Sequence, residues 1–181
     1  MKKLSMIFVA ILMMAGFSMK VMAQTSATLT TLTAAGAQLI VPMTIGEDAP
    51  LHFGTINLLT GVAGTVVLST QAGRSVTGGV ALSAVTPTAT NAAYHVAGTY
   101  NETYALTLPS SITVTETVGS SATMTISLLK ARFNGAGADA VTSKLSALGV
   151  DNFTVGGTLT VGTSQLGGIY AGIFNISVDY N

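Results

Sequence analysis

The residues that could support catalysis are few and scattered. The 181-residue chain has no cysteine and only two histidines, His52 and His95. A histidine-activated nucleophile would need one of them beside a serine and an acid. His95 stands between Tyr94 and Val96 in an alternating run, and His52 precedes Phe53. Both histidines are therefore expected at exposed strand positions, and we predict no catalytic residues and no enzyme activity.

Metal and cofactor sites are not predicted either. Two isolated histidines lack the spaced ligand pairs of zinc sites. The segment NGAGAD, residues 134–139, carries side-chain oxygens only at its first and last residues and lacks the glutamate of calcium loops, so we interpret it as a flexible connection. The glycines of GGV (78–80) and TVGGTL (154–159) lack the strand-to-helix context of a phosphate loop. We interpret them as bulges or close-packing positions.

The N-terminus has the pattern of a secretory signal peptide. Two lysines precede a mostly apolar run from Leu4 to Phe17, which is shorter than the ~20 residues of a membrane span. Cleavage is expected after Ala23, so residues 1–23 are the predicted signal peptide and residues 24–181 one mature domain. A buried helix is the alternative for the apolar run. Export through the Sec pathway implies transit through the periplasm to the cell surface or beyond, without stable membrane insertion.

Charge and composition exclude further classes. Without the three lysines of the signal peptide, four basic and seven acidic side chains remain, which gives a net charge of −3 with neutral histidines. Nucleic acid is not an expected partner, because phosphate binding relies on clustered Lys and Arg. Without cysteine, the core must hold without disulfides. A chain of this length can bury about 70% of its unfolded surface, so such a core is feasible.

Beyond the signal peptide, apolar and polar residues alternate in short runs. A period of two, bounded by glycine, proline or asparagine, is typical of half-buried strands. We expect about eight to ten short strands, and their even spacing predicts an all-β sandwich or a barrel. The runs are residues 65–70, 79–84, 93–98, 103–109, 111–117, 122–129 and 152–162, with one or two more within 27–57 and one at the chain's end.

At most one short helix is expected. Val141, Leu145 and Leu148 recur at helical spacing within residues 139–149, and Gly149 could end such a helix. A loop or an irregular edge strand fits the same residues, so the sequence leaves these alternatives open.

The last fifteen residues, GGIYAGIFNISVDYN, alternate up to a penultimate tyrosine. One face of the predicted strand carries Tyr170, Gly172, Phe174, Ile176, Val178 and Tyr180. Chain ends usually fray because nothing ties them down. This pattern instead predicts that the chain ends as a half-buried strand.

The export signal, the all-β body and this terminal strand together resemble the subunits of bacterial chaperone-usher pili. In that family the last strand alternates, ends with a penultimate tyrosine and carries a glycine fourteenth from the end, as Tyr180 and Gly168 do here. LHFGTI, residues 51–56, resembles a segment of the archaic pilins. The mature chain is also similar to a bacterial domain-of-unknown-function family of secreted pilin-like proteins that end in a glycine, an aromatic residue and V-x-Y-N.

The resemblance implies an immunoglobulin-like, pilin-like β-sandwich that lacks one strand. Its groove would be filled first by a periplasmic chaperone and then, with the help of an usher, by a like subunit. The assembly strand would comprise Gly168, Tyr170, Phe174, Ile176, Val178 and Tyr180. The donated segment would present Ala27, Leu29, Thr31 and Thr33. Many pilins carry a disulfide that this chain cannot form, and residues 27–41 could instead be an ordinary first strand.

Three functions follow from these alternatives. The first is an exported structural or adhesive subunit of a bacterial surface fibre, assembled by β-strand addition. The second is a self-contained secreted binding domain, for example one that binds carbohydrate. The third is a small outer-membrane β-barrel, which the missing tryptophan disfavours because such barrels carry aromatic girdles.

Overall fold

The structure is a computed structural model that describes residues 31–59 and 61–181. The predicted signal peptide and two predicted donor positions, Ala27 and Leu29, lie outside the described residues. The chain divides into two units, residues 1–38 and 39–181. In the first unit, the described residues 31–38 are exposed and form neither helix nor strand.

The second unit confirms the all-β prediction. It contains thirteen strands, more than the eight to ten expected, and the described residues include no helix. The strands are β1 (Thr44–Ala49), β2 (Ile56–Leu58), β3 (Gly64–Leu68), β4 (Arg74–Gly78), β5 (Val80–Leu82), β6 (Ala92–Ala97), β7 (Thr103–Thr107), β8 (Ser111–Glu116), β9 (Thr123–Phe133), β10 (Thr142–Lys144), β11 (Val150–Val161), β12 (Tyr170–Ala171) and β13 (Ser177–Tyr180).

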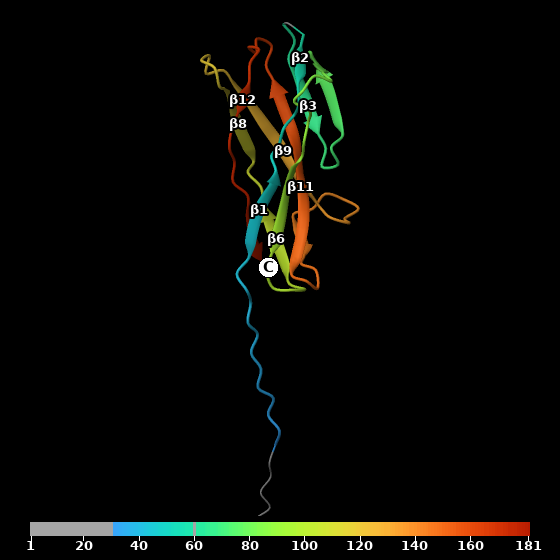
Figure 1. The fold of residues 1–181 in the computed structure, drawn as a ribbon, viewed down its shortest axis with the longest axis vertical. Helices are drawn as coiled ribbons and strands as arrows, with labels where there is room; N and C mark the ends of the chain where they lie inside the picture. Colours follow the sequence, from blue (N-terminus) through green and yellow to red (C-terminus); the bar gives the residue numbers. More distant parts are fainter. Residues whose placement is uncertain (1–30, 60) are drawn as a thin grey trace, which may run out of the picture. The chain divides into compact units, whose positions relative to one another are not determined.

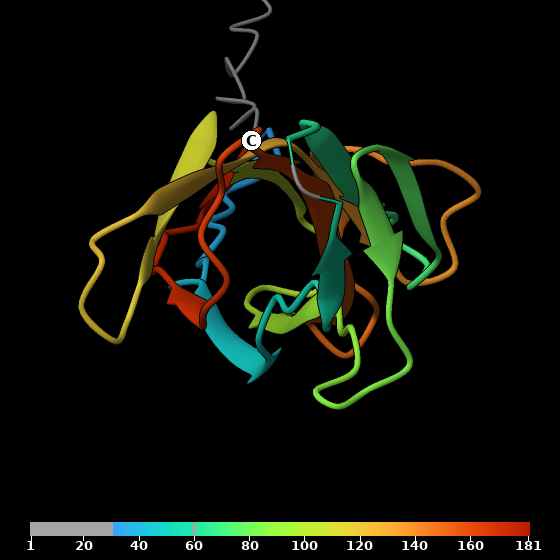
Figure 2. The same ribbon diagram turned by 90° about the horizontal axis from the view of Figure 1, so that it is seen from above.

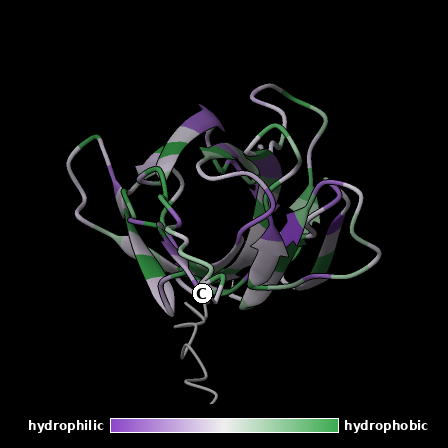
Figure 3. Cartoon of the chain, turned by 90° about the horizontal axis from the view of Figure 1, so that it is seen from below, coloured by the Kyte–Doolittle hydropathy of each residue, from purple (hydrophilic) through white to green (hydrophobic). Residues whose placement is uncertain are grey.

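One large antiparallel sheet organises the unit. Its strand order is β1-β6-β11-β9-β8-β12, and β3 and β4 continue it beside β11. The two longest strands, β9 and β11, lie at its centre, and the sheet curls as seen along their length (Figures 1 and 2). Two small sheets accompany it, β10-β7-β13 and β2-β5. Apolar and polar bands alternate along the strands (Figure 3), because successive side chains point to opposite faces.

The glycine pair of β11 marks the point where this strand changes partner. Residues 150–155 pair with β6, and residues 157–161 pair with β3. Opposite β9, the register shifts between Gly156 and Thr158. A side chain at Gly156 would meet the carbonyl oxygen of Leu68. The interpretation of this pair as a bulge and close-packing position is therefore confirmed.

The core has two halves, a lower one near β6 and an upper one near β8 and β12 in the view of Figure 1. In the lower half, β7 packs against the large sheet, and Tyr94, Tyr104, Phe133 and Phe153 form an aromatic group. In the upper half, side chains of β3, β8, β9 and β11 form the floor, and residues of loops and short strands cover it, among them Phe53, Ile56, Tyr170 and Phe174. The cover of the upper half is thus made of short segments rather than of one long strand.

Of the alternatives left open for residues 139–149, the helix does not form. Three of its residues form β10, which pairs with β7, and its end is a turn in which the Gly149 amide donates to the Ser146 carbonyl. The irregular edge strand, one of the alternatives left open, is what forms. Helical spacing of three apolar residues was outweighed by the tertiary pairing with β7.

The single closing strand is wrong. Its residues form β12, which pairs with β8, and β13, which pairs with β7, while residues 172–176 belong to no strand. The alternation nevertheless persists. Tyr170, Phe174, Ile176, Val178 and Tyr180 are half-buried, and the residues between them are exposed.

Candidate functional site

The upper half of the core opens into an apolar groove with a cavity volume of about 420 Å³. One wall is the segment from Leu51 to Leu58, and the other runs from Gln165 to Phe174. The floor comes from three neighbouring strands of the large sheet and consists of Ile112, Val114, Met124, Ile126, Leu159 and Val161. Five of these six floor side chains are buried, and the groove lies above them, between the two walls.

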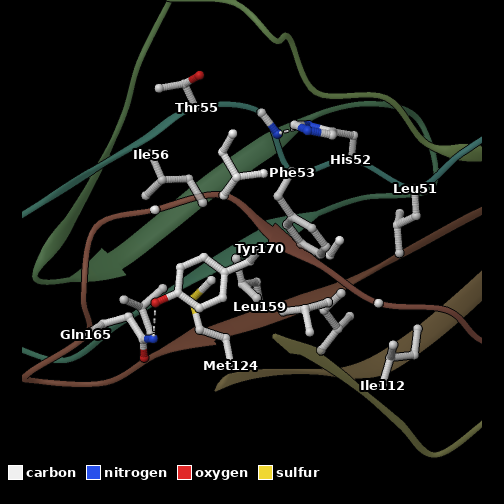
Figure 4. A pocket seen from close by; sticks show the side chains of 18 of the residues that line it. Leu51, His52, Phe53, Thr55, Ile56, Ile112, Met124, Leu159, Gln165 and Tyr170 are labelled. Atoms are coloured by element: carbon white, nitrogen blue, oxygen red, sulfur yellow. Dashed lines mark hydrogen bonds between the residues drawn. The ribbon is translucent and has the colours of Figure 1, made fainter. Parts of the chain in front are cut away.

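On one side, the backbone of the first wall is hydrogen-bonded to a neighbouring segment. His52 exchanges backbone hydrogen bonds with Thr90, at N–O distances of 2.9 and 2.8 Å. Its imidazole Nδ1 accepts from the Gly54 amide and lies away from the groove, whereas Phe53 and Ile56 project into it (Figure 4). The exposed position predicted for His52 is confirmed. Its role is to shape the turn at Gly54, where φ is +77°.

The second wall is held by its own polar contacts. The Tyr170 hydroxyl donates to the Leu166 carbonyl at 2.7 Å and accepts from Gln165 Nε2 at 2.7 Å (Figure 4). A side chain at Gly168 would meet Glu116, so only glycine lets this wall lie against the end of β8. Amides of Ser120 and Val118 donate to the Glu116 carboxylate and lower its pKa.

The six predicted assembly residues divide between two places. Gly168, Tyr170 and Phe174 line the groove. The other three, Ile176, Val178 and Tyr180, pack against the lower half of the core. Phe174 contacts both halves. The C-terminal segment therefore joins the groove to the opposite end of the unit.

The floor residues and the first wall were not predicted as site residues. In the sequence, Ile112 and Ile126 show the same alternation as any core position. The FG turn was the one signal within this wall, through Phe53 and Gly54. Which core residues line the groove depends on pairings between distant strands, and local periodicity does not contain that information.

Among the described residues, several strands pair on one side only. β1, β12 and β4 are edges of the large sheet, and β10 and β13 are edges of the small sheet β10-β7-β13. β12 itself forms part of the second wall, so the groove lies directly beside an unpaired edge. Unpaired edges offer backbone donors and acceptors to an additional strand.

The predicted donor positions that the structure describes, Thr31 and Thr33, are exposed. The alternative of an ordinary first strand over residues 27–41 is wrong for its described part, because residues 31–41 form no strand and the first strand begins at Thr44. Leu39 and Ile40 are also exposed. Of the apolar side chains just before β1, Leu39 and Ile40 are thus outside the core, whereas Met43 packs against it.

The remaining polar side chains do not form a second site. His95 is exposed, as predicted, and its Nδ1 lies 2.7 Å from Asp48 Oδ1. Asp139 ends the glycine-rich segment and accepts from Thr70 Oγ1 at 2.7 Å and from Arg132 Nε at 3.1 Å. Within residues 31–59 and 61–181, no three His, Asp or Glu residues gather where they could hold a metal ion.

Asp139 should make stability depend on pH. The hydrogen bond from Thr70, and then Arg132, lowers its pKa. The stabilisation is therefore complete above the unfolded value of about 3.9 and is lost as the pH falls through the folded value. We expect Asp139→Asn to be less stable than the wild type at pH 7, and the difference should shrink as the pH falls below about 3.9.

Urea unfolding from pH 7 to pH 2.5 measures this effect. Asp179→Asn, at an exposed position of β13, is the matched control and should change stability by less than about 0.5 kcal/mol at either pH. A deficit in Asp139→Asn that stays constant down to pH 2.5 would contradict the assignment.

Comparison with known proteins identifies the domain but no activity. No helix among the described residues is long and apolar enough to cross a membrane. A search of curated proteins finds no match to the chain. Residues 43–180, from just before β1 to the penultimate tyrosine, match the family described as "Domain of unknown function (DUF4402)". Since this match spans more than half of the chain, the protein belongs to the DUF4402 family.

Proposed function

We propose that the protein is an exported structural or adhesive subunit of a bacterial surface fibre and that it assembles by β-strand addition. The observation that carries this proposal is the apolar groove beside the free edge of β12. A donated extended segment would place alternate side chains on the groove floor and pair its backbone with the free edge.

The donated segment is the N-terminal part of a second copy. Residues 31–37 are exposed and form no strand, which favours their donation to another molecule. The segment includes Ala27, Leu29, Thr31 and Thr33, whose side chains share one face when extended. Passage through the periplasm is supported by the predicted signal peptide. The help of a chaperone and an usher is supported by the resemblance to pilins and by the tendency of an open strand edge to aggregate.

A charge placed on the groove floor tests this proposal. Met124 is half-buried on β9 and lines the groove, so Met124→Asp puts an unpaired carboxylate under the donated segment. Burying that charge without a partner should weaken strand addition by at least about a hundredfold. The measurement is the ladder of SDS-resistant multimers formed by the mature chain.

Leu128→Asp is the matched control. Leu128 lies on the same strand and is 70% exposed, so the same charge should leave the ladder intact. Circular dichroism checks that both variants fold. A wild-type chain that stays monomeric at every concentration would contradict assembly and favour the self-contained binding domain. If both variants formed the same ladder as the wild type, the contact between subunits would not lie in the groove.

A further inference from the structure

The penultimate tyrosine, Tyr180, packs against the core and also makes two hydrogen bonds through its hydroxyl. Its hydroxyl accepts a hydrogen bond from the Thr99 amide at 2.6 Å and donates one to the Val41 carbonyl at 2.6 Å. Thr99 Oγ1 in turn accepts from the Val41 amide at 2.6 Å. Both backbone polar groups of Val41 are therefore held by the pair Tyr180 and Thr99, which we call the root clamp.

The surroundings are shaped for this clamp. A side chain at Gly98 would collide with the Tyr180 hydroxyl, so glycine leaves the space that the phenol occupies. Thr99 is one of the few buried polar residues of the described chain. The backbone of Tyr180 is fixed independently, because β13 pairs with β7 and the Asn181 amide donates to the Thr103 carbonyl.

The clamp acts at the boundary of the domain. Val41 lies two residues beyond Leu39, where the second unit begins, and three residues before β1. Leu39 and Ile40 are exposed, and Pro42 has no amide hydrogen to donate. In the described part of this stretch, residues 31–43, Val41 is the residue whose amide and carbonyl are both bound by named partners.

We propose that the Tyr180 hydroxyl is a positioning residue that fixes Val41 as the root of the donated segment. Residues before Val41 remain available to a neighbouring copy, and residues from Val41 onward stay with their own domain. Without the clamp, the residues before β1 lengthen the flexible connection between successive subunits. The part of this inference that concerns the joint rests on the proposed function, whereas the clamp itself does not.

Hydrogen exchange of the mature chain tests the clamp directly. In Tyr180→Phe, the Thr99 amide loses its acceptor and the Val41 carbonyl loses its donor, so the clamp opens and the Thr99 and Val41 amides should exchange about tenfold faster. Tyr100→Phe is the matched control, because Tyr100 lies beside Thr99 and is 65% exposed. It should leave both rates unchanged.

Amides of β13 separate positioning from general loosening. If Tyr180 only stabilises the end of the sheet, the Asp179 and Asn181 amides, which face β7, should accelerate as much as those of Val41 and Thr99. If it positions Val41, the ladder between β13 and β7 keeps its protection. Unchanged exchange at Val41, or an equal rise throughout β13, would overturn the proposal.

Gly98→Ala offers a second route to the same result. It retains the tyrosine but places a methyl group where the hydroxyl lies, so it should reproduce the faster exchange of Val41. Thr99→Val removes the acceptor of the Val41 amide. Combined with Tyr180→Phe, it should show less than additive acceleration at Val41, because both changes open one clamp.

The joint between subunits provides the functional readout. The chain has no cysteine, so one spin label at Ser110→Cys reports distances between successive subunits of a multimer. Tyr180→Phe should broaden that distance distribution without reducing multimer yield, and an unchanged distribution would overturn the role at the joint. If no multimers form, the proposed function fails, and the exchange experiment still decides whether the clamp exists.

Discussion

A mature chain without residues 24–38 should lose every multimer and persist as a folded monomer. The division between Gln38 and Leu39 leaves all thirteen strands and both core halves intact. The groove stays open because its floor belongs to β8, β9 and β11. Loss of the ladder therefore reports loss of the donor rather than loss of the fold. Size-exclusion chromatography with light scattering and circular dichroism measures both properties.

Adding the missing segment as a peptide should restore an occupied groove. At a peptide concentration a hundred times its Kd, binding stabilises the domain by about 2.7 kcal/mol. For a domain of this size, that raises Tm by roughly 5–10 °C. A peptide of the same composition in scrambled order is the control. Multimers that survive the deletion, or equal shifts with both peptides, would contradict donation by this segment.

The hardest feature to predict from the sequence was the boundary between the donated segment and the domain. Residues 27–41 alternate well enough to be a first strand, and local pattern alone does not distinguish a strand of the domain from a segment offered to another molecule. The structure shows that β1 begins at Thr44 and pairs with β6. This pairing joins residues about fifty positions apart, beyond the reach of any local window.

The regular strands were predictable because a period of two is a local property. β3 and β7 alternate buried and less buried positions as their sequences do. The missed strand, β4, contains a single apolar residue, Val76, so its sequence shows no alternation. The break between β12 and β13 was hidden because alternation continues through residues 172–176 while the pairing partner changes from β8 to β7.

The root clamp shows that local sequence pattern does not predict individual hydrogen bonds either. Alternation placed Tyr180 on the half-buried face, which the structure confirms. Its hydroxyl, however, binds Val41, 139 residues away. A hydroxyl at the edge of a core needs a polar partner, but the sequence does not say which one. The face of a residue is therefore predictable from its neighbours, whereas its hydrogen-bond partner depends on the topology.

The second large effect is expected in the lower half of the core, at Phe133. This residue ends β9 and is 4% exposed. Its ring centroid lies 5.7 Å from that of Tyr104, edge to face, and 5.5 Å from that of Phe153. Phe133→Ala removes a ring from the centre of the aromatic group and should lower the free energy of unfolding by about 3–5 kcal/mol. Thermal and urea unfolding measure this loss.

Two controls show what this variant means for function. Phe133→Leu keeps most of the volume and should cost less than Phe133→Ala, because it loses the aromatic contacts but leaves a smaller cavity. Val118→Ala, at an exposed position, should change stability by less than about 0.5 kcal/mol. Phe133 does not line the groove, so Phe133→Ala should bind the donor peptide with unchanged Kd below its lower Tm. Weaker peptide binding in proportion to lost stability would show instead that the two halves of the core act as one unit, and that the open groove is not an independent site.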